Sequence, residues 1–306
     1  MTDPWRRLAE TLGDRLTFQA PLRDFTTFRV GGPARALARP EKLEELQALL
    51  AAARDEGAPV IVLGGGSNLL FDDAGFDGLV IKLGSGFAGL EGLGTLVRAG
   101  AAAAAADLLA WALARDLGGL EGLTGLPGSV GGAVAGNAGA GPEGLGRAVS
   151  RLFILDGGGG RIRTFKAEDL NFTYRRLEGL PEGAVILEVE FGLTPGPAGD
   201  IRARLEEFRE RRRSQPLGGR SAGCVFKNPP SLSAGRLIDE CGFKGHRAGG
   251  ARVSEAHANF ILAEAGATAA DILALIDHVR RGVLARHGLT LELELKVIGP
   301  GGEVRA

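Results

Sequence analysis

The chain has 306 residues, enough for two or three domains that each bury a hydrophobic core. Hydrophobic residues make up 44% and charged residues 24%, as in ordinary soluble proteins, and a net charge of −1 argues against a general basic surface for nucleic acid. No apolar run reaches the roughly 18 residues needed to span a membrane, and the first residues lack the apolar core of a secretion signal. Cys224 and Cys241 are the only cysteines, so we expect no disulfide framework and a cytoplasmic location.

The first third of the chain predicts a small α/β unit. A helix is expected over residues 40–50, with Pro40 in its first turn and leucines along one face. Residues 59–63 and 79–83 are typical of buried strands. Residues 101–117 predict a helix whose alanine-rich start permits close packing.

The middle of the chain predicts a β-hairpin, a further strand and a linker. Residues 151–155 and 161–165 are expected to pair around the loop Asp156–Gly160, and residues 184–191 to form another strand. Residues 194–199, which are rich in proline and glycine, are the best candidate for a linker.

The last third predicts three helices and a final strand. Asp200 and Ser233 can each cap a helix, and the sequence from Thr268 to Asp271 resembles a capping box that opens a longer one. That longer helix is expected to stop at Gly288. Residues 289–298 alternate between apolar and charged side chains, which indicates a strand.

Two glycine-rich stretches are the most informative features, residues 119–141 and residues 63–71. Apolar residues separate their glycines, so both are expected to be ordered, unlike a flexible linker. Glycine lets backbone N–H groups approach a large ligand closely, and two such loops indicate a long anionic ligand such as a dinucleotide.

Other ligand motifs are weak or missing. The segment Gly139–Gly144 formally fits the Rossmann fingerprint, but no strand precedes it and it contains Pro142. The chain has no P-loop, no zinc-type helix motif and no metal-ligand spacing among its four histidines, so no metal site is expected.

Polar residues gather in residues 221–229, where Cys224, Lys227 and Asn228 fall within five positions. The chain has six lysines against thirty arginines, so Lys227 and Lys244 are candidates for specific roles. Taken alone, a cysteine is more often an inert core residue, and Tyr174-Arg175 would be a surface loop.

Eight short motifs occur in a characteristic order along nearly the whole chain. They are Thr27–Ala34, Gly64–Leu70, Gly125–Gly132 with Asn137–Gly139, Phe172–Arg175, Gly223–Pro229, Gly242–Gly245, Ser254–Phe260 and Glu294–Gly299. Each is weak alone, but the ordered set is specific. By these motifs the sequence resembles the UDP-N-acetylenolpyruvoylglucosamine reductases, which act in peptidoglycan precursor synthesis.

The resemblance implies an α+β fold. It consists of an FAD-binding domain of the vanillyl-alcohol-oxidase type, in two α/β subdomains, and a C-terminal α+β substrate-binding domain. The implied ranges are 1–76 for the first FAD subdomain, joined by the C-terminal strand 289–306, then 77–197 for the second and 198–288 for the substrate domain. The short connection between Arg175 and Phe226 indicates the shorter subtype, which lacks an extra substrate-capping insert.

The resemblance also implies the chemistry. UDP-N-acetylglucosamine enolpyruvate is reduced to UDP-N-acetylmuramate, with hydride passing from NADPH to non-covalent FAD and then to C3 of the enolpyruvyl group. Arg175 would stabilise the developing charge because its guanidinium matches a carboxylate, and Glu294 would hold that geometry. Cys224, which stands where many relatives have serine, would protonate C2, and a thiol with a pKa of about 8.5 is far more acidic than a hydroxyl.

Further roles follow from the same motifs. The residues implied to bind FAD are Arg29, Gly64, Gly65, Gly66, Ser67, Asn68, Gly128, Ser129, Gly132, Asn137 and Ala138. Those implied to bind the substrate are Tyr174, Lys227, Asn228 and Lys244. No metal, nucleic acid, membrane span or obligate protein partner is expected.

Two other functions are compatible with parts of the sequence. A flavin-dependent oxidase on the same fold would explain the glycine-rich loops but not the motifs after residue 200. A non-catalytic nucleotide-sugar binding protein would not need Arg175, Cys224 and Glu294 together.

Overall fold

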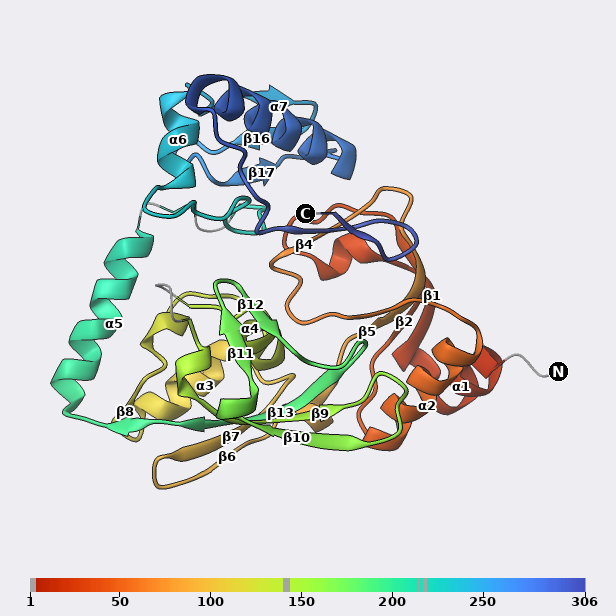
Figure 1. Ribbon diagram of the computed structural model, residues 1–306. Coiled ribbons are helices and arrows are strands. Elements are labelled where there is room, and N and C mark those ends of the chain that lie inside the picture. Colours follow the sequence, from red (N-terminus) through yellow and green to blue (C-terminus); the bar gives the residue numbers. More distant parts are fainter. Residues whose placement is uncertain (1–3, 140–143, 214, 217–218, 306) are drawn as a thin grey trace. The chain divides into compact units, whose positions relative to one another are not determined.

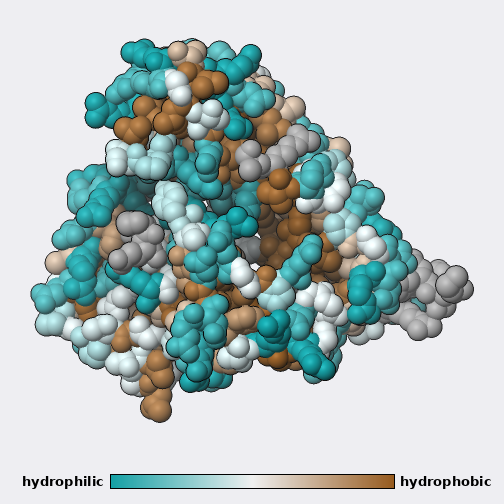
Figure 2. All heavy atoms as spheres, in the orientation of Figure 1, coloured by the Kyte–Doolittle hydropathy of each residue, from teal (hydrophilic) through white to brown (hydrophobic). Residues whose placement is uncertain are grey.

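The computed structural model describes residues 4–139, 144–213, 215–216 and 219–305. The chain divides into two compact units (Figure 1). Unit 1 comprises residues 1–17, 37–65 and 79–213, and unit 2 comprises residues 18–36, 66–78 and 214–306. On the face drawn in Figure 2, hydrophilic side chains cover most of the surface and apolar side chains show in smaller patches.

Unit 1 is built around a five-stranded antiparallel sheet with the strand order β10-β9-β13-β7-β6. Its strands are β6 (Leu90–Leu93), β7 (Leu96–Gly100), β9 (Val149–Leu155), β10 (Ile162–Lys166) and β13 (Val185–Gly192). Alternate residues of the central strands face the core, so Val97, Leu152 and Val189 are fully buried. Helices α3 (Ala105–Leu113) and α4 (Val130–Ala135) cover this face of the sheet, and their apolar residues complete the core (Figure 1).

Unit 1 also contains further helices and strands. They are α1 (Pro4–Leu12), α2 (Leu43–Asp55), β3 (Val60–Val62), β8 (Leu117–Gly118), β11 (Asn171–Thr173), β12 (Arg176–Glu178), β14 (Thr194–Pro195) and α5 (Ala198–Arg212). Strands β11 and β12 pair as a hairpin, and this hairpin holds Tyr174 and Arg175 at its turn.

Unit 2 combines small sheets with two helices. Its elements include β4 (Leu69–Phe71), α6 (Ala234–Glu240), β15 (Arg247–Ala248), β16 (Ala251–Val253), β17 (Ile261–Ala263), α7 (Ala269–His287), β18 (Lys296–Ile298) and β19 (Val304–Arg305). Helix α7 packs on β15 and β16, and its residues Ile272, Ile276 and Val283 lie in the core (Figure 1). Strand β18 pairs in parallel with β4, with Val297 opposite Leu70.

A further sheet has the order β1-β2-β5-β3 and is formed by β1 (Leu16–Pro21), β2 (Pro33–Ala38), β5 (Phe76–Ile81) and β3. Three of the five boundaries between the units fall within β1, β2 and β5. Strands β3 and β5 are parallel, with Ile61 opposite Val80. Within the described ranges, no helix combines the length and apolar character that crossing a membrane requires.

Several expected elements are confirmed. Strands β9 and β10 pair as a hairpin with Ile162 opposite Leu155, and Ser233 caps α6. The Thr268 hydroxyl accepts a hydrogen bond from the Asp271 N–H, and the Asp271 carboxylate accepts one from the Thr268 N–H, so the capping box that opens α7 is present.

Two helices begin later than expected because other groups bind the backbone of the residues before them. The Glu45 carboxylate accepts the N–H groups of Glu41 and Lys42, so α2 begins at Leu43 and Pro40 lies outside it. The backbone N–H groups of Ala101 and Ala102 donate to strand and loop carbonyls instead of closing helical turns. Helix α3 therefore begins only at Ala105.

The expected linker and final strand also differ from the prediction. Residues 194–195 form β14, which pairs with β8, and α5 begins at residue 198, so Asp200 lies in its first turn instead of capping it. Residues 289–295 keep the alternation of burial, but Glu294 and Leu295 both donate to the Val225 carbonyl. This irregular pairing leaves only β18 as a regular strand.

Candidate functional site

The two glycine-rich loops meet in unit 1 at a cavity of about 400 Å³. The loop after β3 supplies Gly64 and Gly65, and the segment before α4 supplies Gly128 and Ser129. A Cβ atom added to Gly65 would lie 2.6 Å from the Gly128 Cα atom, and one added to Gly64 would lie 2.6 Å from the Ser129 Oγ atom. Glycine at position 65 therefore allows the two backbones to approach closely, and glycine at position 64 leaves room for the Ser129 hydroxyl.

Small residues line most of the rest of this cavity. Ala101, Ala102 and Ala104 come from the turn before α3, and Gly131 and Gly132 come from the first turn of α4. The Ser129 hydroxyl accepts a hydrogen bond from the Gly132 N–H and so caps α4. The cavity is thus shaped by backbone and methyl groups, as a site for an extended ligand requires.

Lys82 is a cavity residue that the sequence reasoning did not assign. It follows β5, its Nζ atom donates to the Gly64 carbonyl at 2.9 Å, and it is half-buried. Burial lowers the pKa of its ammonium group, and the nearby positive charge of Arg39 lowers it further. The sequence did contain a signal for Lys82, because the chain has only six lysines and this one directly follows an apolar strand.

Asn137 and Arg175 are held together with the segments around them in unit 1. The buried Asn137 amide donates to the Thr173 carbonyl at 2.9 Å and accepts the Gly146 N–H at 2.8 Å. The half-buried Arg175 donates from Nη1 to the Gly139 carbonyl at 2.7 Å. The hairpin turn that bears Arg175 is therefore fixed to Gly139, in the glycine-rich stretch of residues 119–141.

Three of the predicted site residues have left-handed backbones. The φ angles are 56° at Arg29, 39° at Asn137 and 61° at Arg175. Such conformations cost energy in residues with side chains and are enriched at functional sites. Tyr174, next to Arg175, places its ring 5.2 Å from the guanidinium carbon.

The FAD-binding candidates Gly66, Ser67 and Asn68, in the glycine-rich loop of residues 63–71, belong to unit 2, as does Arg29. The Gly66 carbonyl accepts the Thr27 N–H at 3.1 Å, and a Cβ atom at Gly66 would lie 2.0 Å from the Phe25 carbonyl oxygen. Gly66 also has a φ of +63°, so both the close contact and the left-handed backbone favour glycine at this position. Arg29 is exposed beside this loop, and Ser67 and Asn68 continue it toward β4.

Cys224 and Glu294 lie on neighbouring backbone segments of unit 2. The Val225 carbonyl, next to Cys224, accepts the Glu294 N–H at 2.9 Å. Both side chains are half-buried. The Asn68 amide donates to the Glu294 carbonyl at 3.1 Å, so the residue expected to contact FAD holds the Glu294 backbone.

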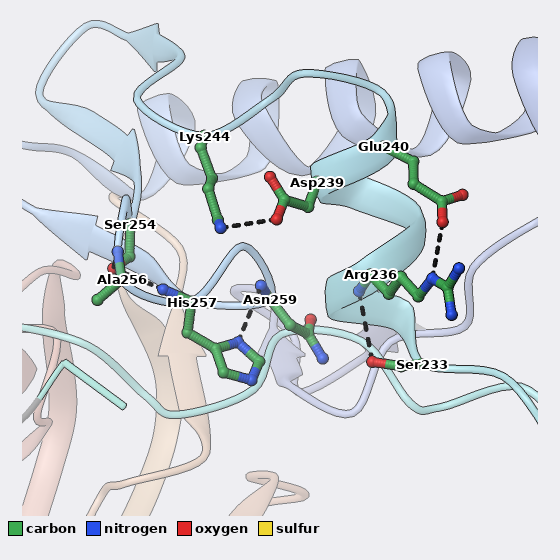
Figure 3. A network of polar contacts seen from close by, with 9 residues as sticks. All are labelled: Ser233, Arg236, Asp239, Glu240, Lys244, Ser254, Ala256, His257 and Asn259. Carbon is green, nitrogen blue, oxygen red and sulfur yellow. Dashed lines mark hydrogen bonds and ion pairs between the residues drawn. The ribbon is translucent and has the colours of Figure 1, made fainter. Parts of the chain in front are cut away.

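The remaining substrate-binding candidates of unit 2 have defined partners. Lys227 pairs with Glu292 at 3.3 Å, and Lys244 pairs with Asp239 at 2.6 Å (Figure 3). The Asn228 carbonyl oxygen accepts the Ala234 N–H at the start of α6.

His257 is a further titratable residue in this region that the sequence reasoning did not assign. Burial lowers the pKa of its imidazole, a local backbone hydrogen bond partly offsets this, and the positive charge of Lys244 lowers it again. Figure 3 shows His257 beside Asn259, whose N–H donates to the His257 Nδ1 atom at 3.3 Å.

The predicted residues thus fall into two sets, one in each unit. One is in unit 1 and comprises Gly64, Gly65, Gly128, Ser129, Gly132, Asn137, Ala138, Tyr174 and Arg175. The other is in unit 2 and comprises Arg29, Gly66, Ser67, Asn68, Cys224, Lys227, Asn228, Lys244 and Glu294. The Rossmann-like segment has its residues 140–143 outside the described ranges. In the part of the chain that is described, no group of three or more His, Cys, Asp or Glu side chains could hold a metal ion.

Comparisons with known proteins define the class and then the family. Residues 34–164 match the model of an FAD-binding domain, and residues 215–298 match that of the UDP-N-acetylenolpyruvoylglucosamine reductase C-terminal domain. The chain is therefore a two-part flavoprotein with an α+β fold, as expected. The cavity walls fit this cofactor, since they offer closely packed glycines and a cationic side chain to a long diphosphate ligand.

Relatives of the whole chain give the family. A UDP-N-acetylenolpyruvoylglucosamine reductase of Syntrophobacter fumaroxidans is 44% identical, over 97% of this chain and 87% of its own length. One of Heliobacterium modesticaldum is also 44% identical, over 93% of this chain and 91% of its length. The crystal structure of the Thermus caldophilus enzyme superposes with a TM-score of 0.80 at 39% identity, covering 92% of this chain and 97% of that one. The chain belongs to the UDP-N-acetylenolpyruvoylglucosamine reductase family and is an FAD-dependent oxidoreductase.

Proposed function

We propose that this reductase works with NADPH in the cytoplasm and that Arg175, Cys224 and Glu294 carry its chemistry. The substrate is UDP-N-acetylglucosamine enolpyruvate, and the product is UDP-N-acetylmuramate. The observation that carries the proposal is the placement of Cys224 and Glu294, which are 70 positions apart in sequence (294 − 224) and are joined through the Val225 carbonyl. Thiols in place of a disulfide at Cys224 and Cys241 fit a reducing compartment.

The cofactor would be held by the cavity of unit 1. FAD, when bound, supplies the hydride-transfer chemistry of the reaction. The backbone of Gly64, Gly65 and Gly128 would lie against the diphosphate, because glycine leaves N–H groups accessible. Lys82 would add a positive charge to this wall, and its bond to the Gly64 carbonyl keeps the loop in place.

Arg175 would stabilise the charge that develops on the substrate carboxylate. A guanidinium presents a planar pair of N–H donors that matches a carboxylate. The bond from Nη1 to the Gly139 carbonyl fixes the side chain beforehand, so little reorganisation is needed during the reaction. The left-handed backbone of Arg175 is consistent with a residue held in place for function.

Cys224 would give its proton to C2 of the enolpyruvyl group, and Glu294 would orient the reacting carboxylate. A thiol is acidic enough to protonate a developing carbanion. Lys227, Asn228, Lys244 and Tyr174 would bind the nucleotide-sugar portion of the substrate. The ion pairs that Lys227 and Lys244 make with Glu292 and Asp239 keep their long side chains ordered.

Cys224→Ala tests this assignment. It should leave flavin reduction by NADPH intact but slow reoxidation by the enolpyruvyl substrate by about 10²–10⁴, the contribution typical of a general acid. Cys224→Ser should keep substantial activity, because a hydroxyl can pass a proton from the same position. The measurement is single-turnover mixing of reduced enzyme with substrate. Reoxidation of Cys224→Ala at the wild-type rate would remove Cys224 from the mechanism.

A further inference from the structure

The Asn259 side chain takes the place of a neighbouring strand beside Phe226. Its Oδ1 atom accepts the Phe226 N–H at 2.9 Å, and its Nδ2 atom donates to the Phe226 carbonyl at 2.8 Å. Both residues are 2% exposed. A buried backbone N–H and C=O need partners, and here one side chain supplies both.

A primary amide can make both of these bonds at neutral pH without any change of protonation state. An amide offers an acceptor and two donors, whereas an ionised carboxylate only accepts and an alkyl group does neither. The sequence reasoning placed Asn259 in a family motif without giving it a role. Its burial and its two bonds to one residue now identify what the amide does.

The clamped residue, Phe226, lies two positions after Cys224, and the segment of residues 224–226 is fixed on both sides. The Val225 N–H donates to the Asn259 carbonyl at 2.9 Å, while the Val225 carbonyl accepts the Glu294 N–H at 2.9 Å. Cys224 itself pairs with Phe260 in an isolated antiparallel bridge. Asn259 and its neighbour therefore hold the backbone of residues 224–226 from one side, and Glu294 holds it from the other.

We propose that Asn259 is a positioning residue for the Cys224 thiol and sets its placement relative to Glu294. This inference rests on the proposed function of Cys224. Asn259 acts through the Phe226 and Val225 backbone and does not touch the substrate. Without the amide, the segment of residues 224–226 would shift to satisfy the Phe226 N–H and carbonyl, and the Cys224 thiol would shift with it.

Asn259→Asp tests the proposal because lowering the pH should reverse the defect of this variant. Above its pKa, which burial raises, the new carboxylate lacks a donor and repels the Phe226 carbonyl. Below it, the acid form again donates and accepts. Reoxidation of reduced flavin by the enolpyruvyl substrate should therefore be slowed about tenfold to 10²-fold at neutral pH and recover toward the wild-type rate as pH falls. His257 and Glu294 are unchanged in the variant, so the ratio of variant to wild type isolates the new carboxylate.

Controls separate positioning from loss of stability. Val279→Ala removes buried volume from α7 and should slow neither half-reaction, even where its melting temperature falls as far as that of Asn259→Leu. Asn259→Leu should slow reoxidation at every pH, with flavin reduction by NADPH within about twofold of wild type. Iodoacetamide labelling followed by mass spectrometry should show a changed rate at Cys224 and an unchanged rate at Cys241, whose thiol lies near the Gly282 carbonyl.

Two results would overturn the inference. One is reoxidation by Asn259→Asp that, at neutral pH, is as fast as that of wild type or no slower than that of Val279→Ala at matched stability. The other is unchanged Cys224 labelling in Asn259→Leu. If Cys224→Ala keeps full activity, the proposed proton donor fails instead, and the labelling of Cys224 still decides whether Asn259 positions the thiol.

Discussion

In the proposed mechanism, Arg175 is the residue whose geometry matters most for catalysis. We expect Arg175→Lys to keep the charge but lose about 10²–10³ in turnover, because lysine cannot present two parallel donors to a carboxylate. Flavin reduction by NADPH should be nearly unchanged, since it precedes the enolpyruvyl chemistry. Stopped-flow measurement of the two half-reactions checks this. Equal slowing of both would mean that Arg175 only maintains the structure.

Lys82 should contribute to FAD affinity through its charge. A charge-assisted hydrogen bond is worth about 1.5–3 kcal/mol, so Lys82→Met should weaken FAD binding by roughly tenfold to a hundredfold. Riboflavin, which lacks the diphosphate, should bind both proteins alike, and Lys82→Arg should restore part of the affinity. Titration of the apoprotein by flavin fluorescence measures this, with the exposed Lys166→Met as the matched control. A parallel loss of riboflavin binding would show that Lys82 only supports the Gly64 loop.

At the scale of elements, the start of α2 is tied to the segment before β1. Arg15 donates from both terminal nitrogens to the Glu45 carboxylate, at 2.7 and 2.8 Å. These bonds are the largest cause that lowers the pKa of Glu45 from 4.5 to about 2; burial opposes them, and two backbone N–H groups and the Arg15 charge lower it further. The folded state therefore favours the ionised form, and this stability is present above pH 4.5 and is lost as pH falls through about 2.

Glu45→Gln should therefore lower the melting temperature at neutral pH, by the few degrees that correspond to about 1 kcal/mol. The difference from wild type should shrink between pH 4.5 and 2, because wild-type Glu45 then becomes neutral as well. Thermal melts across this range measure it, with Glu44→Gln on the exposed side of α2 as the control. A difference that stays constant with pH would contradict the assigned pKa.

Local signals along the sequence correctly predicted the elements whose boundaries do not depend on residues far away in the chain. The capping box at Thr268 and the hairpin of β9 and β10 depend on adjacent residues, and both are confirmed. The start of α3 and the regular part of the last strand depend on hydrogen bonds to Leu187 and Val225, far away in sequence. Cys224 was indicated by a motif of adjacent residues. The roles of Lys82 and Asn259 depend on hydrogen-bond partners elsewhere in the chain, so they could be recognised only in the folded structure.

At the scale of the whole molecule, the flavin should be bound without a covalent link. The chain has no histidine before His246, and the described residues around the cavity include no histidine, cysteine or tyrosine that could form one. Acid precipitation should therefore release the yellow chromophore into the supernatant. Flavin that stays on the denatured pellet would contradict this expectation and favour a flavin-dependent oxidase.

The central claim is that one chain passes hydride from NADPH to an enolpyruvyl nucleotide sugar. Anaerobic stopped-flow absorbance of the purified holoenzyme tests it most directly. NADPH should bleach the bound flavin, and UDP-N-acetylglucosamine enolpyruvate should then restore its colour while UDP-N-acetylmuramate forms in equal amount. Flavin that NADPH does not reduce, or that only oxygen and not the enolpyruvyl substrate reoxidises, would contradict the account.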